Sequence, residues 1–228
     1  MKAIIFDSST LISFSMNGMF EELRKLKKMF DGKFLITLEV KGEIIDKPVT
    51  IKKYELEALM LNQLLEEKVL EMPDSVGVDN KQISIKTREI SNIANNIFIA
   101  NGKPMTLISD GETSCLALSN ILNDKKITNV IAVDERTTRL LCEDPIALKK
   151  LFQKRFHTGI NYKKENQKFL GNFKFIRSAE LVYVINQKEL TSLKDPRTLD
   201  AMIWAVRFKG CYISDDEIRE IVSLGRKH

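Results

Sequence analysis

Two short, continuous apolar runs, each ending at an aspartate, constrain this chain most strongly. Residues 3–6 are Ala-Ile-Ile-Phe and precede Asp7, and residues 130–133 are Val-Ile-Ala-Val and precede Asp134. Apolar runs of this length are typical of strands buried on both faces of a parallel sheet. They are far too short to cross a membrane. A third run, Phe-Leu-Ile-Thr at residues 34–37, predicts another strand.

Apolar residues recur at helical spacing between these runs. This spacing predicts helices at residues 20–30, 54–65, 83–98, 109–122 and 198–208, a helix that begins within 40–45, one around 140–142 and a last one from Ser214. Residues 69–72 and 181–185 are strand-like. The alternation predicts an α/β fold with a central, mostly parallel sheet and helices on both faces. A chain of 228 residues can bury a sizeable core, so we expect one domain over residues 1–228.

The cysteine and histidine content argues against several classes of enzyme. Cys115, Cys142 and Cys211 form no CxxC pair, which is typical of reduced, mostly buried thiols. His157 and His228 are the only histidines, so a nucleophile–histidine site would have to use His157, and a zinc site lacks ligands. The chemistry must therefore depend mainly on carboxylates. No signal-peptide-like segment is found, so we expect a cytoplasmic protein.

Positive charge gathers in the last third of the chain. The net charge is +5, of which residues 1–150 contribute −1 and residues 151–228 contribute +6. Aromatic residues are interleaved with the basic ones, a pattern that suits contact with phosphates and stacking of bases. A solvated face above ordinary core aromatics explains the pattern equally well. The candidate RNA-binding residues are Lys154, Arg155, Lys163, Lys164 and Lys168.

Four carboxylates are predicted to meet at one edge of the sheet. Asp7 and Asp134 directly follow strands, and the carboxyl edge of a parallel sheet is where α/β proteins place their sites. Glu112 lies at a helix start, and Glu43 lies early in the helix after the second strand. Four acids brought together need a cation or protons. Carboxylate oxygens favour Mg²⁺ or Mn²⁺, and such a cluster suits phosphodiester hydrolysis.

Each of these acids also has a purely structural interpretation. Asp7 and Asp134 could cap the helices that follow them. Glu112 matches the capping-box spacing Ser-x-x-Glu. Glu43 could be a solvated helix residue, and Glu39 is a rival four positions earlier.

The order and local sequence of the four acids resemble the PIN-domain nucleases. The segments that carry this resemblance are Ile-Ile-Phe-Asp-Ser-Ser-Thr-Leu-Ile at 4–12, Val-Lys-Gly-Glu-Ile at 40–44, Asp-Gly-Glu-Thr-Ser-Cys-Leu-Ala-Leu-Ser at 110–119 and Val-Ile-Ala-Val-Asp-Glu-Arg-Thr-Thr-Arg at 130–139. They are similar to the family's first strand and turn, its Val-x-x-Glu segment, its Gly-Glu helix start, and its last acidic strand end. Residues 197–209 and 214–224 also resemble the family's closing helix pair.

The resemblance implies a PIN-like fold and a metal-dependent ribonuclease, specifically an endoribonuclease that acts on single-stranded or structured RNA. It implies that Asp7, Glu43, Glu112 and Asp134 are both the catalytic residues and the ligands of Mg²⁺ or Mn²⁺. It further implies that Ser9 and Thr10 are hydrogen-bonding neighbours, that Glu135 is an accessory acid, and that Arg136 reaches a phosphate or pairs with the cluster. No membrane partner is expected, and a homodimer or a protein partner is compatible with this assignment.

The chain departs from the family pattern at three places. Gly42 precedes Glu43 inside a predicted helix, where glycine is unfavourable. The last acid pair is Asp134-Glu135 rather than two aspartates. The chain is also longer than the compact toxin members, with a basic aromatic insertion at about 154–196. These departures favour an RNA-processing role over a toxin role.

Three alternatives compete with the nuclease hypothesis. The first is a non-cleaving PIN-fold RNA-binding protein that acts as a scaffold or as a component of a processing complex. The second is a phosphatase of the haloacid-dehalogenase type, which requires an aspartate where this chain has Ser9. The third is a receiver-like scaffold module, in which acids at strand ends bind a regulatory ion.

Overall fold

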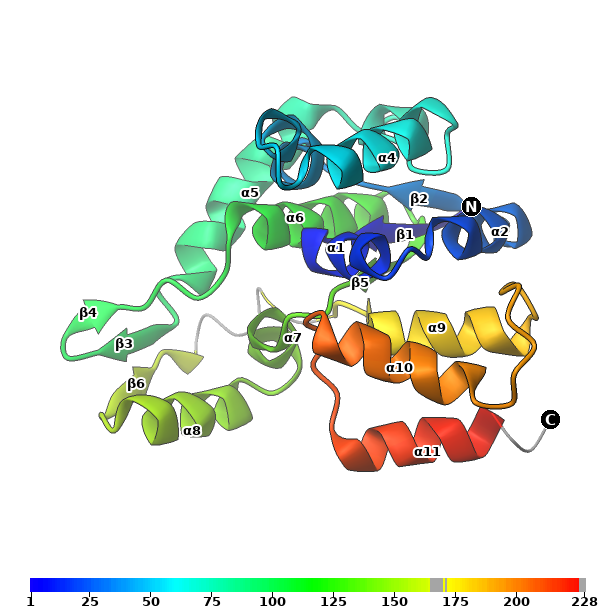
Figure 1. The fold of residues 1–228 in the computed structure, drawn as a ribbon. Coiled ribbons are helices and arrows are strands. Elements are labelled where there is room, and N and C mark those ends of the chain that lie inside the picture. Colours follow the sequence, from blue (N-terminus) through cyan, green and yellow to red (C-terminus); the bar gives the residue numbers. More distant parts are fainter. Residues whose placement is uncertain (165–169, 171, 226–228) are drawn as a thin grey trace.

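A four-stranded parallel sheet forms the centre of the structure, a computed structural model that describes residues 1–164, 170 and 172–225. Its strands lie in the order β2 (Lys33–Leu35), β1 (Lys2–Phe6), β5 (Thr128–Ala132) and β7 (Phe175–Ile176) (Figure 1). Ile4 lies opposite Phe34 on one side and Val130 on the other. The strands predicted at 3–6, 34–37 and 130–133 are confirmed, with ends shifted by one or two residues.

The sheet is apolar because it is covered. Ile5 and Phe6 of β1 are fully buried, and the rings of Phe6 and Phe34 meet edge to face with centroids 5.1 Å apart. Strands covered in this way have no solvated face that would favour alternation of polar and apolar residues. The sequence of β1 is therefore a continuous apolar run.

Helices flank the sheet, and α6 packs against both β1 and β5. The helices are α1 (Ser8–Met16), α2 (Phe20–Met29), α3 (Leu38–Lys41), α4 (Glu55–Glu66), α5 (Asn80–Ala94), α6 (Asp110–Asp124), α7 (Arg136–Glu143), α8 (Pro145–Phe156), α9 (Ser178–Gln187), α10 (Thr198–Phe208) and α11 (Asp215–Gly225), with the short turns η1 (Gly42–Asp46), η2 (Pro48–Thr50) and η3 (Pro73–Val76). The predicted α/β class, a parallel sheet flanked by helices, is confirmed. Among the described residues, no helix combines the length and the apolar character needed to cross a membrane.

Two strand predictions are wrong. Residues 181–185 lie inside α9, where Leu181, Val182 and Ile185 are buried while the two residues between them are only partly so. That spacing belongs to one face of a helix, and the apolar contacts override the strand preference of Val and Ile. Residues 69–72 contribute only an isolated bridge, between Leu35 and Glu71, within the described part of the chain.

A second sheet, which is antiparallel and separate from the main one, is not among the elements predicted from the sequence. Its order is β4 (Lys103–Pro104), β3 (Phe98–Ala100), β6 (Ile160–Tyr162), and α8 packs against β6. We call residues 97–106 and 145–164 the basic lobe. It projects to the lower left in Figure 1. The helix predicted at 83–98 ends at Ala94 because Phe98 enters β3.

The predicted insertion at 154–196 is divided between two parts of the molecule. Its beginning completes α8 and forms β6 in the basic lobe, whereas its later part forms α9 and β7, the edge strand of the main sheet. One cluster of buried apolar residues includes members of both parts, such as Phe152 of the lobe and Val182 of α9.

Candidate functional site

Asp7 lies at the carboxyl end of β1, where it caps α1. Its Oδ2 accepts hydrogen bonds from the backbone N–H of Ser9 (3.0 Å) and from the Ser9 hydroxyl (2.6 Å). Its Oδ1 is buried and has no hydrogen-bond partner among the described residues. Burial raises the pKa of Asp7 against the lowering effect of the Ser9 hydrogen bonds, and the charge of Glu43 raises it further. The capping interpretation holds for one oxygen, and the second oxygen remains available.

Glu43 lies in the π-helical turn η1, and its carboxylate lies against Gly111 at the start of α6. A Cβ added to Gly111 would lie 2.7 Å from both carboxylate oxygens of Glu43. The two elements are held together by a 2.6 Å hydrogen bond between the hydroxyls of Thr37, which caps α3, and Ser114 of α6. Gly42 adopts ordinary right-handed helical angles, so it does not interrupt the helical path to Glu43. The glycine at position 111 makes room for this carboxylate.

Glu112 joins the capping box of α6 to the cluster. Its Oε2 accepts the backbone N–H of Ser109 (2.7 Å), and its Oε1 accepts the hydroxyl of Thr138 in α7 (2.7 Å). Burial raises the pKa of Glu112 to about 6, hydrogen bonds from Ser109 and Thr138 oppose the shift, and the charges of Asp7 and Glu135 add to it. Glu112 is therefore close enough to Asp7 to feel its charge while it caps a helix.

Asp134 is also buried, but its carboxylate has other partners. Its Oδ1 accepts the backbone N–H of Ser178 (2.7 Å), and its Oδ2 accepts the Ser178 hydroxyl (2.6 Å), at the start of α9. Burial raises the pKa of Asp134, and the hydrogen bonds from Ser178 oppose that shift. The groups that act most strongly on it are Ser178, Cys211 and Glu180 rather than the other three predicted acids. The structure thus brings Asp7, Glu43 and Glu112 together and directs Asp134 toward α9.

Only some of the predicted accessory residues form hydrogen bonds with the predicted acids. Ser9 joins the two strand ends, because its hydroxyl donates to Asp7 and accepts the backbone N–H of Asp134 (3.0 Å). Thr10 does not act as predicted: its buried hydroxyl has no hydrogen-bond partner in the described part of the chain. Glu135 caps α7 by accepting the backbone N–H of Thr138 (3.0 Å).

Arg136 does not pair with the carboxylates. Its guanidinium lies over the ring of Tyr212, 4.1 Å from the centroid. Within residues 1–164, 170 and 172–225, none of Asp7, Glu43 or Glu112 takes part in an ion pair. The cluster of three carboxylates therefore has no cationic side chain to balance it.

Sequence reasoning missed four residues that shape the site: Gly111, Thr138, Ser178 and Cys211. The role of Ser178 is missed because residues 181–185 are predicted as a strand. A serine shortly before a strand gives no reason to expect a contact with Asp134. Gly111 lies within the Gly-Glu pair that carries the resemblance, so its role had a visible signal. Thr138 lies one turn into α7, within hydrogen-bonding reach of Glu112.

The three carboxylates fit a hard divalent cation in their chemistry, although the side chains do not converge on a finished coordination site. All donors are oxygens, which suits Mg²⁺ or Mn²⁺, and the buried Oδ1 of Asp7 has no hydrogen-bond partner in the described part of the chain. In the described parts of the chain, no group of three or more His, Cys, Asp or Glu side chains is arranged closely enough to hold a metal ion. A bound ion would therefore require these side chains to draw together.

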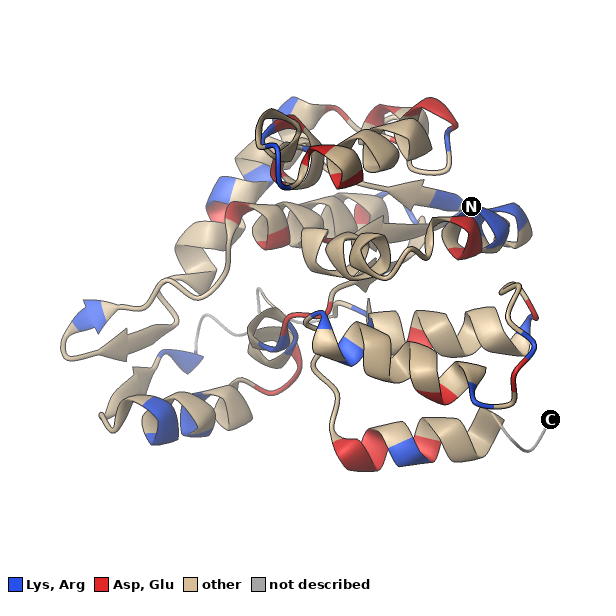
Figure 2. Ribbon diagram, in the orientation of Figure 1, with Lys and Arg blue, Asp and Glu red and all other residues tan. Residues whose placement is uncertain are grey.

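The basic lobe accounts for the net positive charge of the chain. It contains seven Lys and Arg residues and no Asp or Glu, so the rest of the chain contributes −2 to the net charge of +5. Figure 2 shows these residues on α8, β4 and the end of β6. None of the seven forms an ion pair with another described residue. Of the predicted RNA-binding residues, Lys154, Arg155, Lys163 and Lys164 belong to the lobe, and Lys168 lies outside the described residues.

The aromatic residues of the lobe are mainly its core. Phe98 meets Phe152 and Tyr162, with ring centroids 6.3 and 5.4 Å apart. Phe156 differs: it is half exposed, and the guanidinium of Arg155 lies 5.7 Å from its ring centroid. The structural interpretation of the interleaved aromatics therefore holds for most of them, and Phe156 remains an exposed stacking surface.

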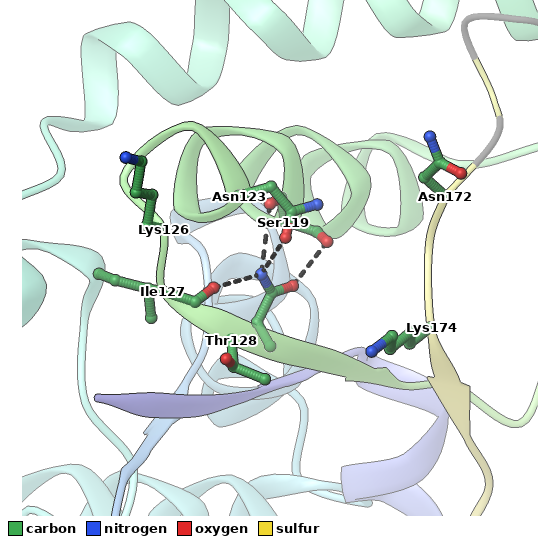
Figure 3. A pocket seen from close by; sticks show the side chains of 8 residues that line it. Ser119, Asn123, Lys126, Ile127, Thr128, Asn172 and Lys174 are labelled. Carbon is green, nitrogen blue, oxygen red and sulfur yellow. Dashed lines mark hydrogen bonds between the residues drawn. The ribbon is translucent and has the colours of Figure 1, made fainter.

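A polar pocket of about 240 Å³ lies at the opposite, amino end of β5 (Figure 3). Its amide groups bond to one another: Asn129 donates to the side chain of Asn123 (2.8 Å) and to the carbonyl of Ile127 (3.0 Å), and it accepts the Ser119 hydroxyl (2.6 Å). These bonds fasten β5 to α6. We therefore place the candidate site at the carboxyl edge of the sheet.

Comparisons with known proteins give no family. The chain matches no protein-family model, no curated protein and no solved structure.

Proposed function

We propose that this protein is a divalent-metal-dependent ribonuclease whose active site is the carboxylate cluster at the carboxyl edge of the main sheet. The observation that carries the proposal is the buried Asp7, which lies beside two further carboxylates. One of its oxygens is held by Ser9, and among the described residues the other has no hydrogen-bond partner and no cation pairs with the cluster. Buried carboxylates that are not paired are unfavourable unless a cation or protons compensate them.

Asp7, Glu43 and Glu112 would hold one or two Mg²⁺ or Mn²⁺ ions. When bound, such ions stabilise phosphate charge and supply an activated water for hydrolysis of a phosphodiester. The chain's own contribution is positioning: Ser9 fixes the Asp7 carboxylate, Thr138 and Ser109 fix Glu112, and Gly111 leaves space for Glu43. Asp134, whose two oxygens each accept one hydrogen bond from Ser178, would join as a fourth ligand only if its carboxylate turned toward the other three.

The basic lobe would hold the RNA backbone. Its seven basic side chains have no ion-pair partners among the described residues, so they are free to contact phosphates. Arg155 and the half-exposed Phe156 would add stacking on a base.

The experiment that tests the activity is cleavage of a mixed single-stranded RNA pool with Mn²⁺, with Mg²⁺ or with EDTA. Cleavage that requires the metal supports the proposal, and cleavage that persists in EDTA contradicts it. A matched DNA pool in the same assay measures the preference for RNA.

A second candidate is the non-cleaving RNA-binding protein, favoured by the two hydrogen bonds that occupy both oxygens of Asp134. RNA that is retained on the protein but is not cut with any of the metals would select this candidate.

The role of the lobe has its own test. We expect the double variant Lys163→Gln, Lys164→Gln to bind single-stranded RNA more weakly and to reduce the slope of log affinity against log salt by about 1.4, because each of the two lost phosphate contacts removes roughly 0.7. The matched control changes the exposed Lys28 and Lys209, which lie outside the lobe and have no ion-pair partner in the described chain. An unchanged slope for the Lys163 and Lys164 variant would remove these two residues, which follow β6, from the RNA surface.

A further inference from the structure

A second cavity adjoins the carboxylate cluster and shares Glu43 with it. It has a volume of about 520 Å³ and lies between α1, η1 and α4. Its walls are mostly apolar, with Ile12 and Met16 from α1 facing Tyr54 and Leu61 on the α4 side. Pockets of roughly 300–1,000 Å³ with apolar walls and a few polar groups are typical of sites for small organic groups.

The apolar walls are open to solvent. Tyr54 is 45% exposed and Met16 is 53% exposed. The ammonium group of Lys53 lies 5.0 Å from the centroid of the Tyr54 ring. A flat aromatic ring with a cation beside it is a surface on which a base can stack while the cation faces a phosphate.

The polar groups of the cavity have unused hydrogen-bonding capacity. Glu57 makes neither a hydrogen bond nor an ion pair with any described residue. Ser15, which is 8% exposed, has a buried hydroxyl without a hydrogen-bond partner in the described part of the chain. A ligand that fills this cavity should therefore combine flat apolar faces with hydrogen-bond donors at its edge.

We propose that this cavity receives a base of the RNA substrate and that guanine is preferred. Guanine presents two adjacent donors, its N1–H and its amino group, which match the two oxygens of a carboxylate such as Glu57. Adenine and cytosine place an acceptor beside their amino group, and uracil presents a single donor between two carbonyl oxygens. The position of the base rests on the proposed function, because Glu43 belongs to both the cavity and the cluster.

The test measures RNA binding without cleavage. The protein carries Asp7→Asn, no metal is added, and the ligands are short uridine oligonucleotides in which one position is guanosine, inosine or uridine. Inosine keeps the N1–H but lacks the amino group. We expect the guanosine oligonucleotide to bind about tenfold more tightly than the uridine one, as for one good charged hydrogen-bond pair, with inosine between them.

Two substitutions locate the effect. Glu57→Gln should abolish the preference for guanosine, whereas Glu66→Gln, on the same helix but outside the cavity, should retain it. Tyr54→Ala should weaken all three oligonucleotides about tenfold, because stacking acts on every base. Circular dichroism and thermal unfolding of each variant check that the fold persists.

The outcomes separate this inference from the nuclease proposal. Equal affinity for the three oligonucleotides, or a preference that survives Glu57→Gln, overturns the guanine pocket even if metal-dependent cleavage is observed. A preference that depends on Glu57 supports the pocket even if no cleavage is found. RNA binding that neither Glu57→Gln nor Tyr54→Ala changes also overturns it, and would favour a protein helix as the occupant.

Discussion

Asp7 at the end of β1 and Asp134 at the end of β5 lie on neighbouring strands, and each is only 1% exposed. They differ in their partners. Ser9 holds one oxygen of Asp7 and leaves the other unpartnered among the described residues, whereas Ser178 holds both oxygens of Asp134. The surroundings differ as well, since Asp7 feels the charge of Glu43 and Asp134 that of Glu180. Burial alone therefore does not distinguish the two carboxylates; the oxygen of Asp7 that has no partner among the described residues does.

The largest effect is expected from Asp7→Asn. Removing the charge should reduce metal-dependent RNA cleavage by at least about 100-fold, in the range seen when a directly acting group is lost. Stability should stay within about 1 kcal/mol, because the amide oxygen can still accept both Ser9 hydrogen bonds and the unpaired buried charge is removed. Cleavage assays and urea unfolding measure the two quantities. Unchanged cleavage would remove Asp7 from the active site.

Gly111→Ala tests the group of carboxylates around Asp7, at the end of β1, without replacing any of them. The new Cβ would lie 2.7 Å from both Glu43 oxygens, so Glu43 must move. We expect metal affinity and cleavage to fall by about 10- to 100-fold, as for loss of a group that orients a ligand. Stability should hold or rise slightly, because alanine favours a helix more than glycine does.

The matched control for this variant is Gly42→Ala. Gly42 has ordinary helical angles, and an added Cβ there meets nothing within 4 Å. It should therefore leave metal affinity unchanged, as measured by calorimetric titration with Mn²⁺. Equal effects of the two substitutions would show that the packing of Glu43 against Gly111 is not needed.

In contrast to Asp7→Asn, Asp134→Asn is expected to affect stability more than cleavage. The amide has one oxygen for two donors, so either the N–H or the hydroxyl of Ser178 loses its acceptor. We expect a loss of about 1–2 kcal/mol in the free energy of unfolding, measured with urea. A double-mutant cycle with Ser178→Ala should show that the two effects are not additive. If Asp134→Asn abolished cleavage at unchanged stability, Asp134 would be a ligand like Asp7.

The sequence predicts one of the two strand ends better than the other for a physical reason. Asp7, Ser9 and the Gly111-Glu112 pair act over short distances along the chain, through a cap at the start of α1 and a capping box at the start of α6. Local patterns of this kind can be recognised in a sequence. The partner of Asp134 comes from Ser178, 44 residues further on, and a contact of that range leaves no local pattern.

The fold, too, is predicted well only where a local sequence pattern decides it. Three of the four strands of the main sheet, β1, β2 and β5, are predicted by continuous apolar runs, whereas β7 is not predicted. The strands of the basic lobe are not predicted either, because β3, β4 and β6 have only two or three residues each and β6 pairs with β3, which lies far back along the chain. The strand predicted at 181–185 is wrong. Val and Ile favour strands, but burial of one helical face decides the structure of this segment.

The smallest effect is expected from the ion pair between Arg177 and Glu217, which lies next to the Ser178 that binds Asp134. Arg177, next to Ser178, donates to the carbonyl of Tyr212 (3.1 Å) and to Glu217 (2.8 Å), and the backbone N–H of Tyr212 donates to the carbonyl of Asp134 (3.3 Å). Burial acts to raise the pKa of Glu217, but hydrogen bonds from Ser214 and Arg177 hold it at about 2, below its ordinary value of 4.5.

Because the folded pKa of Glu217 is lowered, its contribution to stability is present above about pH 4.5 and is lost as the pH falls toward about 2. The side chain of Glu217 is 41% exposed, so we expect only about 1 kcal/mol. Urea unfolding near neutral pH should show Glu217→Gln less stable than the unchanged protein by this amount, with the gap closing as the pH is lowered through that window. Glu220→Gln, on the same helix, is the control and should show no gap. A gap for Glu217→Gln that is the same at every pH would mean that packing, rather than the charge facing Arg177, fastens α11 to the start of α9.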